Sequence, residues 1–171
     1  MLAAGTGDPD AFRELVVAHQ RGAWGVASRF LGDPAEAEDV AQEAFLKILA
    51  AAPRYRPTAP FRAYLYQVVT RLCLDRAEKK RPEYTDALPE VADTAPDPAQ
   101  ALIGREREAA VRNALAALPD TQRMAVILKH FQDLSYAEIA EALGVSAKAV
   151  EGLLGRARSA LHLRLAPLER G

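Results

Sequence analysis

The chain has 171 residues, of which 50 % are hydrophobic and 26 % charged, a composition typical of a folded protein rather than a disordered one. Its single cysteine, Cys73, excludes an internal disulfide and a cysteine-built zinc site, and the lack of a signal peptide or long apolar run predicts a cytoplasmic protein without membrane insertion. The net charge of −1 by itself argues against a nucleic-acid partner, but charge is segregated along the chain.

The periodicity of the apolar residues predicts helices along the chain and no strand of useful length, so the expected fold class is all-α. The dipeptide Asp-Pro at 8–9 and at 33–34 predicts two helix starts, because aspartate caps a helix and proline fits its first position. The helices expected in this half cover about 9–31, 34–50 and a stretch from Phe61 to the basic run before Pro82.

The second and third of these helices differ in charge. The helix over 34–50 has an acidic face, for which a solvated amphipathic surface is the plain alternative to a protein-binding one. Residues 54–82 carry a net charge of +6 and interleave arginines with Tyr55, Phe61, Tyr64 and Tyr66. Arginines bind phosphate and aromatic rings stack on bases, a combination suited to single-stranded DNA. The alternative is that Phe61 and one tyrosine are core residues and the arginines are solvated.

Residues 83–97 interrupt the helical pattern. They are acidic and proline-rich, contain no basic residue, and show little apolar periodicity. We therefore expect two small helical domains, residues 1–82 and 98–171, joined by an acidic Pro-rich linker over 83–97.

Four helices are expected in the C-terminal domain. The first covers about 98–117. The second follows a break at Pro119, and its apolar stripe, which ends with Phe131, is expected to point inward. A short helix over 136–143 and a last helix over 147–165 complete the domain.

The last two helices form a helix-turn-helix pattern. Ser135 and Glu138 have the spacing of a capping box, Gly144 suits a left-handed turn, and Ser146 is placed to cap the last helix. An ordinary αα-hairpin is the alternative. In the DNA-binding interpretation, the start of the last helix enters a major groove and its arginines meet phosphates.

The residue types that often serve in catalysis or metal binding are scattered along the chain. His19, His130 and His162 fall on three separate expected helices without metal-ligand spacing, and no glycine-rich phosphate loop occurs. We therefore expect no cofactor, no metal site and no enzymatic activity.

Together these segments resemble the extracytoplasmic-function (ECF) sigma factors, the smallest sigma subunits of bacterial RNA polymerase. Residues 36–46 (EAEDVAQEAFL) look like the core-binding helix of region 2, and residues 61–76 (FRAYLYQVVTRLCLDR) are similar to the helix that melts and reads the minus-ten element. Residues 118–123 (LPDTQR) and 134–146 (LSYAEIAEALGVS) look like region 4, which reads the minus-thirty-five element.

The resemblance implies partners and a role for each matching position. The implied partners are core RNA polymerase, through the clamp helices and flap of its large subunits, promoter DNA, and an anti-sigma factor. The implied core-binding residues are Glu38, Asp39, Gln42 and Glu43; the minus-ten residues are Arg54, Tyr55, Arg62, Tyr64, Arg71 and Arg76; and the minus-thirty-five residues are Ser146, Lys148, Arg156 and Arg158.

The last helix departs from the family's usual sequence. Ala149, Glu151 and Leu153 stand where a threonine, a lysine and an arginine are common, so the expected phosphate contacts rest on Arg156 and Arg158. Two other functions stay open: a conventional helix-turn-helix regulator that acts as a dimer, and a helical adaptor that binds only proteins.

Overall fold

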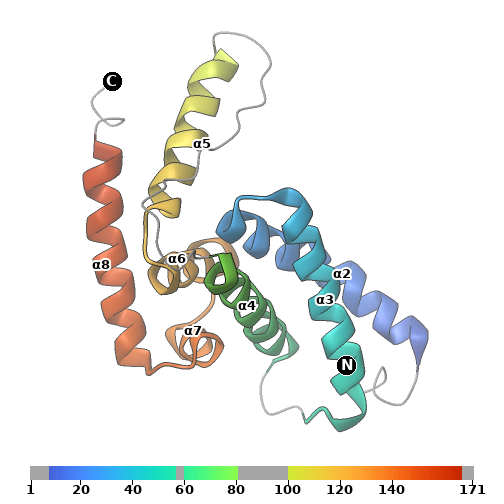
Figure 1. Cartoon of the computed structure of the whole chain (residues 1–171). Helices are drawn as coiled ribbons and strands as arrows, with labels where there is room; N and C mark the ends of the chain where they lie inside the picture. The colour runs from blue at the N-terminus through green and yellow to red at the C-terminus, as the bar shows by residue number, and fades with distance from the viewer. Residues whose placement is uncertain (1–7, 57–59, 81–99, 167–171) are drawn as a thin grey trace.

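The computed structural model describes residues 8–56, 60–80 and 100–166. Within this part of the chain every regular element is helical, as expected (Figure 1). The elements are α2 (Pro9–Leu31), α3 (Pro34–Ala51), the 3-10 turn η1 (Ala52–Arg54), α4 (Phe61–Lys80), α5 (Gln100–Ala116), α6 (Asp120–Gln132), α7 (Tyr136–Leu143) and α8 (Ala147–Leu165). None of the described helices is long and apolar enough to cross a membrane. The expected linker, 83–97, lies outside the described residues.

The two N-terminal helices begin where the Asp-Pro pairs predict. Asp8 and Asp33 each accept hydrogen bonds from two backbone N–H groups of the first turn, at 2.9–3.3 Å. The proline that follows each aspartate has no N–H to leave unpaired. Gly32 ends α2 with a φ of 73°, a left-handed conformation that is strained for a residue with a Cβ. The predicted bounds of the first helix are confirmed.

Helices α2, α3 and α4 pack on one another and form the core of the N-terminal half. Val26 of α2, Val40 and Ile48 of α3, and Leu65 and Val69 of α4 are fully buried. Burial of each such side chain contributes about 1.5–3 kcal/mol to folding. This bundle fixes which faces of α3 and α4 remain available to partners.

In the C-terminal half, α6 lies at the centre and packs against α7 and α8, while α5 lies along α8. The helix-turn-helix has the local geometry that its sequence predicts. The Ser135 hydroxyl accepts a hydrogen bond from the Glu138 N–H, and the Glu138 carboxylate accepts one from the Ser135 N–H. Gly144 adopts a φ of 67° in the turn, and Val150 of α8 is fully buried.

The two halves of the described chain are in contact. Helix α7 packs against α4, and α6 packs against α2, so that α4 and α7 lie side by side in Figure 1. The buried apolar residues form one continuous cluster that extends from Ala23 to Ala157. The C-terminal half therefore covers part of the surface of α2 and α4.

The contact between the halves explains one wrong prediction. Phe131 was expected to point inward, yet it is 44 % exposed. Its ring lies at the boundary with α2, where the Arg29 guanidinium sits 4.2 Å from the ring centroid. A cation over a ring face stabilises an aromatic side chain outside the core. Sequence periodicity describes one helix at a time, so it cannot predict that α2 supplies a cation for a ring on α6.

Candidate functional site

The four side chains expected to bind core polymerase gather on one surface of α3. Glu38, Asp39 and Gln42 are exposed, and Glu43 is half-buried. The Gln42 amide donates a hydrogen bond to the Glu38 carboxylate at 3.4 Å, as the spacing of four residues on a helix allows. The surface presents its carboxylates to solvent, where a basic partner can reach them.

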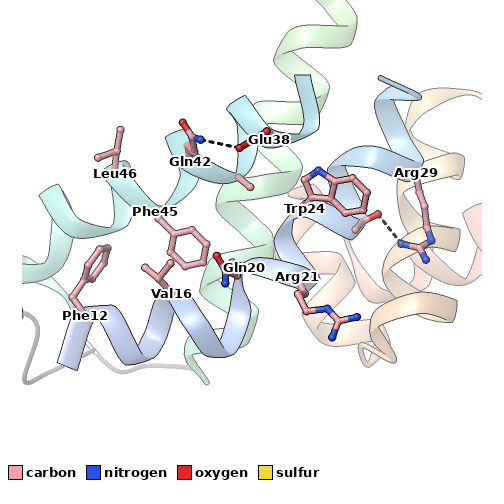
Figure 2. Close-up of a pocket in the computed structure, with 12 residues that line it drawn as sticks. Phe12, Val16, Gln20, Arg21, Trp24, Arg29, Glu38, Gln42, Phe45 and Leu46 are labelled. Atoms are coloured by element: carbon pink, nitrogen blue, oxygen red, sulfur yellow. Dashed lines mark hydrogen bonds between the residues drawn. The ribbon is translucent and has the colours of Figure 1, made fainter. Parts of the chain in front are cut away.

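An apolar groove runs beside this acidic surface, between α2 and α3 (Figure 2). Its volume is about 790 Å³. Phe12, Val16 and Trp24 line it from α2, while Phe45 and Leu46 line it from α3. Trp24 and Leu46 are 43 % and 65 % exposed, although burial of such large apolar surfaces is favourable. This groove and the acidic surface together form a candidate protein-binding site.

Sequence reasoning missed the groove, although one signal was present. Trp24 and Leu46 lie off the buried stripes of their helices, at positions where polar residues are usual. Large apolar residues on the polar side of two neighbouring helices indicate a surface that another protein covers. The spatial pairing of the two helices was needed to bring them together.

Arg76, expected to contact DNA, is paired within the chain. Its guanidinium lies 3.1 Å from the carboxylate of Glu43, which was expected to contact polymerase. Next to this pair, the Lys80 ammonium lies 2.5 Å from the Glu36 carboxylate. Exposed pairs of this kind contribute about 0–1 kcal/mol each. These two ion pairs hold the basic end of α4 against the acidic side of α3. Because each pair contributes so little free energy, a competing partner can break it.

The other expected minus-ten residues lie on η1, the segment after it, and α4. The rings of Tyr55 and Tyr64 are 5.3 Å apart and tilted by 47°, and both side chains are half-buried. Arg54 and Arg71 are exposed. Tyr66 is 3 % exposed, so the interpretation that one tyrosine belongs to the core is right for this residue.

A small pocket of about 290 Å³ lies beside the tyrosine pair. Arg54, Tyr55 and Tyr64 line it from the N-terminal half, and Glu141 of α7 lines it from the C-terminal half. A carboxylate from the helix-turn-helix therefore lies at the surface that the sequence predicts for DNA. Periodicity and motif spacing gave no sign of this contact.

Arg62 also reaches the C-terminal half. Its guanidinium donates a hydrogen bond to the backbone carbonyl of Gln132, the last residue of α6. Burial lowers the pKa of His19, and the charge of Arg62 lowers it further. The His19 ring lies 5.2 Å from the ring of Phe61. One of the expected DNA-binding arginines thus serves as a contact between the halves.

The expected minus-thirty-five residues lie on α8 and its N-cap. The Ser146 hydroxyl caps the helix by accepting a hydrogen bond from the Ala149 N–H at 3.1 Å. Ser146, Lys148, Arg156 and Arg158 are all exposed, and α8 is anchored through Val150, Leu154 and Ala157 on its opposite side. Helix α8 therefore offers an accessible, mildly basic outer surface.

The described residues contain no group of three or more histidine, cysteine or acidic side chains that could hold a metal ion. Cys73 is fully buried in α4, and burial raises the pKa of its thiol to about 12, so the thiol stays protonated and inert.

The Sigma-70 region 2 family matches residues 15–83, and the Sigma-70 region 4 family matches residues 108–161. The ECF RNA polymerase sigma factor SigW of Bacillus subtilis is 31 % identical to the chain, over 95 % of this chain and 92 % of its own length. The RNA polymerase sigma-H factor of Pseudomonas aeruginosa is 33 % identical, over 96 % and 91 %.

A solved structure of CnrH, in complex with the cytosolic domain of CnrY, is similar in fold. It has a TM-score of 0.75 and 28 % identity, and the match covers 96 % of this chain and 93 % of that one. Both sigma regions occur in the expected order, and the two relatives match over nearly the full length. The chain therefore belongs to the ECF sigma factors, which are not enzymes themselves, and it directs promoter-specific transcription initiation by RNA polymerase.

Proposed function

We propose that this sigma factor divides its work among three surfaces. The acidic surface of α3 and the adjoining groove bind core polymerase, α4 with the preceding loop binds the minus-ten element, and α8 binds the minus-thirty-five element. The observation that carries the proposal is the placement of exposed groups: acidic and apolar ones lie together on the side of α3 that borders the groove, and exposed basic ones lie on α4 and α8. The full-length match to sigma factors favours this function over a dimeric regulator or an adaptor.

The core-binding surface suits a helical partner with basic and apolar side chains. Trp24 and Leu46 would be covered by the apolar side of such a partner, and Glu38, Asp39 and Gln42 would pair with its polar side. The clamp helices of the large polymerase subunit are the partner that the family resemblance implies. The groove supplies affinity, and the carboxylates at its edge fix orientation.

The minus-ten surface combines cations with aromatic rings. Arg54 and Arg71 are exposed for phosphate contacts, and the rings of Tyr55 and Tyr64, which pack on each other, would offer a face on which an unpaired base stacks. Arg62 and Arg76 would join them after exchanging their present partners, Gln132 and Glu43, for phosphates.

The minus-thirty-five surface follows from the helical positions on α8. Arg156 and Arg158 are two residues apart, which separates them by about 200° around the helix axis. They therefore flank the outward strip that contains Lys148, one on each side. A helix in the major groove has a phosphate backbone on both flanks, so this arrangement suits phosphate contacts on two strands. Ser146 would contact the same backbone from the helix N-terminus.

We also propose that a separate protein regulates this sigma factor in the cytoplasm. The structure of the relative CnrH contains the cytosolic domain of a second protein, CnrY. The exposed groove between α2 and α3 is a surface of this chain that a regulatory protein would cover, and an anti-sigma factor is the regulator that the family resemblance implies.

Run-off transcription with purified core polymerase tests the proposal, on a promoter selected from genomic fragments. The variant Glu38→Lys/Asp39→Lys reverses two exposed charges that take part in no ion pair of the described structure. We expect at least a tenfold loss of transcription and of core binding. Glu14→Lys, on the exposed side of α2 outside the groove, is the matched control. Equal activity of both variants would mean that this surface does not bind core.

A further inference from the structure

The first half of α8 presents two charged side chains at the proposed DNA-binding surface. Among residues 147–153, only Lys148 and Glu151 have a polar side chain, and both are exposed. A recognition helix contacts base edges mainly through its N-terminal part, so these two side chains are the ones placed to read bases. A carboxylate at this place is unexpected, because it repels phosphate. The proposed function gives no role to Glu151.

The two side chains lie close together on the outer side of α8. Three residues correspond to about 60° around a helix axis and to a rise of about 4.5 Å. Lys148 and Glu151 both point away from the core that Val150 enters. Successive base pairs of DNA are about 3.4 Å apart. When the helix lies in a major groove, the two side chains can therefore face neighbouring base pairs.

The Glu151 carboxylate is free to accept a hydrogen bond from a partner. In the part of the chain that the structure describes, neither Lys148 nor Glu151 belongs to an ion pair. The position one helical turn further on is Gly155, which has no side chain that could cover the carboxylate. Nothing within α8 therefore neutralises this charge or shields it from DNA.

Two glycines keep the surface beside Glu151 low. A Cβ at Gly155 would meet nothing within 4 Å, so packing inside the protein does not require a glycine there. A Cβ at Gly152 would lie 3.3 Å from Nη1 of Arg156, so this glycine leaves room for the guanidinium. Glycine permits the close approach of a backbone to a ligand. A glutamate is shorter than a lysine or an arginine, and the low surface lets α8 sit deep enough for it to reach a base.

The bases differ in the groups that they present in the major groove. Cytosine and adenine present an amino group, whereas guanine and thymine present oxygen acceptors. An ionised carboxylate only accepts hydrogen bonds, so guanine and thymine repel it. Adenine places its N7 acceptor beside the amino group, and cytosine has no such acceptor, so cytosine is the best match for Glu151. The Lys148 ammonium only donates, and guanine with two acceptors is its best match.

We propose that Glu151 selects a cytosine in the minus-thirty-five element and that Lys148 selects a guanine in the neighbouring base pair. This inference rests on the proposed function of α8 and adds the bases that are read. Arg156 and Arg158 supply affinity that does not depend on sequence. The carboxylate lowers that affinity wherever no amino group is within its reach. A residue that weakens binding to most sequences thereby contributes specificity.

A selection of promoters by the holoenzyme tests the assignment. The probe is the promoter chosen from genomic fragments, with its minus-thirty-five segment randomised, and bound duplexes are sequenced. We expect the parent protein to enrich a cytosine next to a G·C pair whose guanine contacts Lys148. Replacement of the cytosine by thymine should weaken binding about tenfold for the parent. For Glu151→Gln the difference should fall to about twofold or less, because this variant gains affinity for duplexes without the cytosine.

Three further variants separate base reading from general effects of charge and folding. Glu151→Lys should exchange the preference for cytosine for one for guanine. Glu108→Gln removes the same charge from an exposed position of α5 and should keep the cytosine preference. Gly155→Leu has room for its side chain and raises helix propensity, so the free protein should be at least as stable in urea as the parent. It should nevertheless reduce the cytosine preference, because it holds α8 further from the bases.

A gain in affinity that is equal for all sequences in Glu151→Gln would overturn the proposal and leave Glu151 a solvated charge. Enrichment of sequences without the cytosine by the parent protein would also overturn it. Failure of the proposed function is a separate result, in which Arg156→Ala/Arg158→Ala binds this promoter as holoenzyme no more weakly than the parent does. If the double variant binds more weakly while the base preference ignores Glu151, only the present inference is wrong.

Discussion

Helices α4 and α8 are both proposed to face promoter DNA, but they differ in how much of that side is open. The side of α4 that carries Arg62 and Tyr66 is in contact with α6 and α7. The outer side of α8, with Lys148 and its arginines, is exposed. Both helices are basic, so their charge alone does not distinguish them as DNA-binding surfaces. On the proposed roles, packing between the halves leaves the α8 surface more accessible to DNA than the α4 surface.

The charged groups of the two helices are also engaged differently. The basic end of α4 is held by Glu43 and Glu36 of α3. For Arg156 and Arg158 of α8, no ion pair is recorded among the described residues. On the proposed roles, α4 would exchange partners before it binds DNA, whereas α8 would bind with little rearrangement. The free protein should therefore contact duplex DNA, weakly, through α8 first.

The largest expected effect comes from truncating matched core residues of the two helices. Leu65→Ala in α4 and Leu154→Ala in α8 each remove a buried side chain and should lower the free energy of unfolding by about 3 kcal/mol. Because the buried cluster is continuous across the halves, we expect one cooperative transition in urea for both variants. Two separate transitions, each moved by only one variant, would show that the halves fold independently.

The next effect concerns DNA binding by the two helices. Arg156→Ala/Arg158→Ala should weaken binding of duplex DNA by the free protein about tenfold and reduce its salt dependence, because two phosphate contacts are lost. Arg71→Ala should leave that binding unchanged and lower only open-complex formation by the holoenzyme. Filter binding at several salt concentrations and permanganate footprinting measure the two outcomes. Equal loss of free-protein binding in both would contradict the difference in access.

A smaller effect is expected from removing one carboxylate near each surface. Glu141→Gln on α7 should raise the affinity of the free protein for single-stranded DNA about threefold, since it removes an anion that faces Arg54 and Tyr64. Glu151→Gln on the exposed outer surface of α8 should raise duplex affinity by a similar factor and leave single-strand binding unchanged. If both variants changed both affinities equally, the two surfaces would not be separate.

Local sequence signals predicted the elements well because capping and periodicity act within one helix. Asp8, Asp33, Ser135 and Gly144 adopt the roles that their residue types predict. Signals of that kind contain no information on how distant helices meet. The position of Phe131, the burial of Tyr66 and the contact of Arg62 with α6 all depend on the packing of the two halves. The site residues expected from the sequence remain predictions. The structure adds that two of them, Arg62 and Arg76, already contact other residues of the chain.

The smallest effect is a pH dependence at the capping box of α7, the helix that covers α4. A hydrogen bond from the Ser135 N–H lowers the pKa of Glu138 below its ordinary value of 4.5; burial opposes this shift, and the Ser135 hydroxyl and Arg62 assist it. Since the unfolded chain holds the proton more tightly, the stability that Glu138 contributes is complete above about pH 5. It is lost as the pH falls through the lower, folded-state pKa.

Glu138→Gln should therefore cost about 0.5 kcal/mol of stability at pH 7 and progressively less as the pH falls below 4.5. Urea unfolding of the two proteins over this range measures the difference. Glu141→Gln, which removes the same charge from α7 and leaves the capping box intact, should keep the pH dependence that Glu138 provides. Because Arg62 belongs to the covered surface of α4, Arg62→Ala should reduce the pH-dependent part slightly. A pH dependence unchanged by Arg62→Ala would mean that the charge of Arg62 on α4 does not affect the protonation of Glu138 on α7.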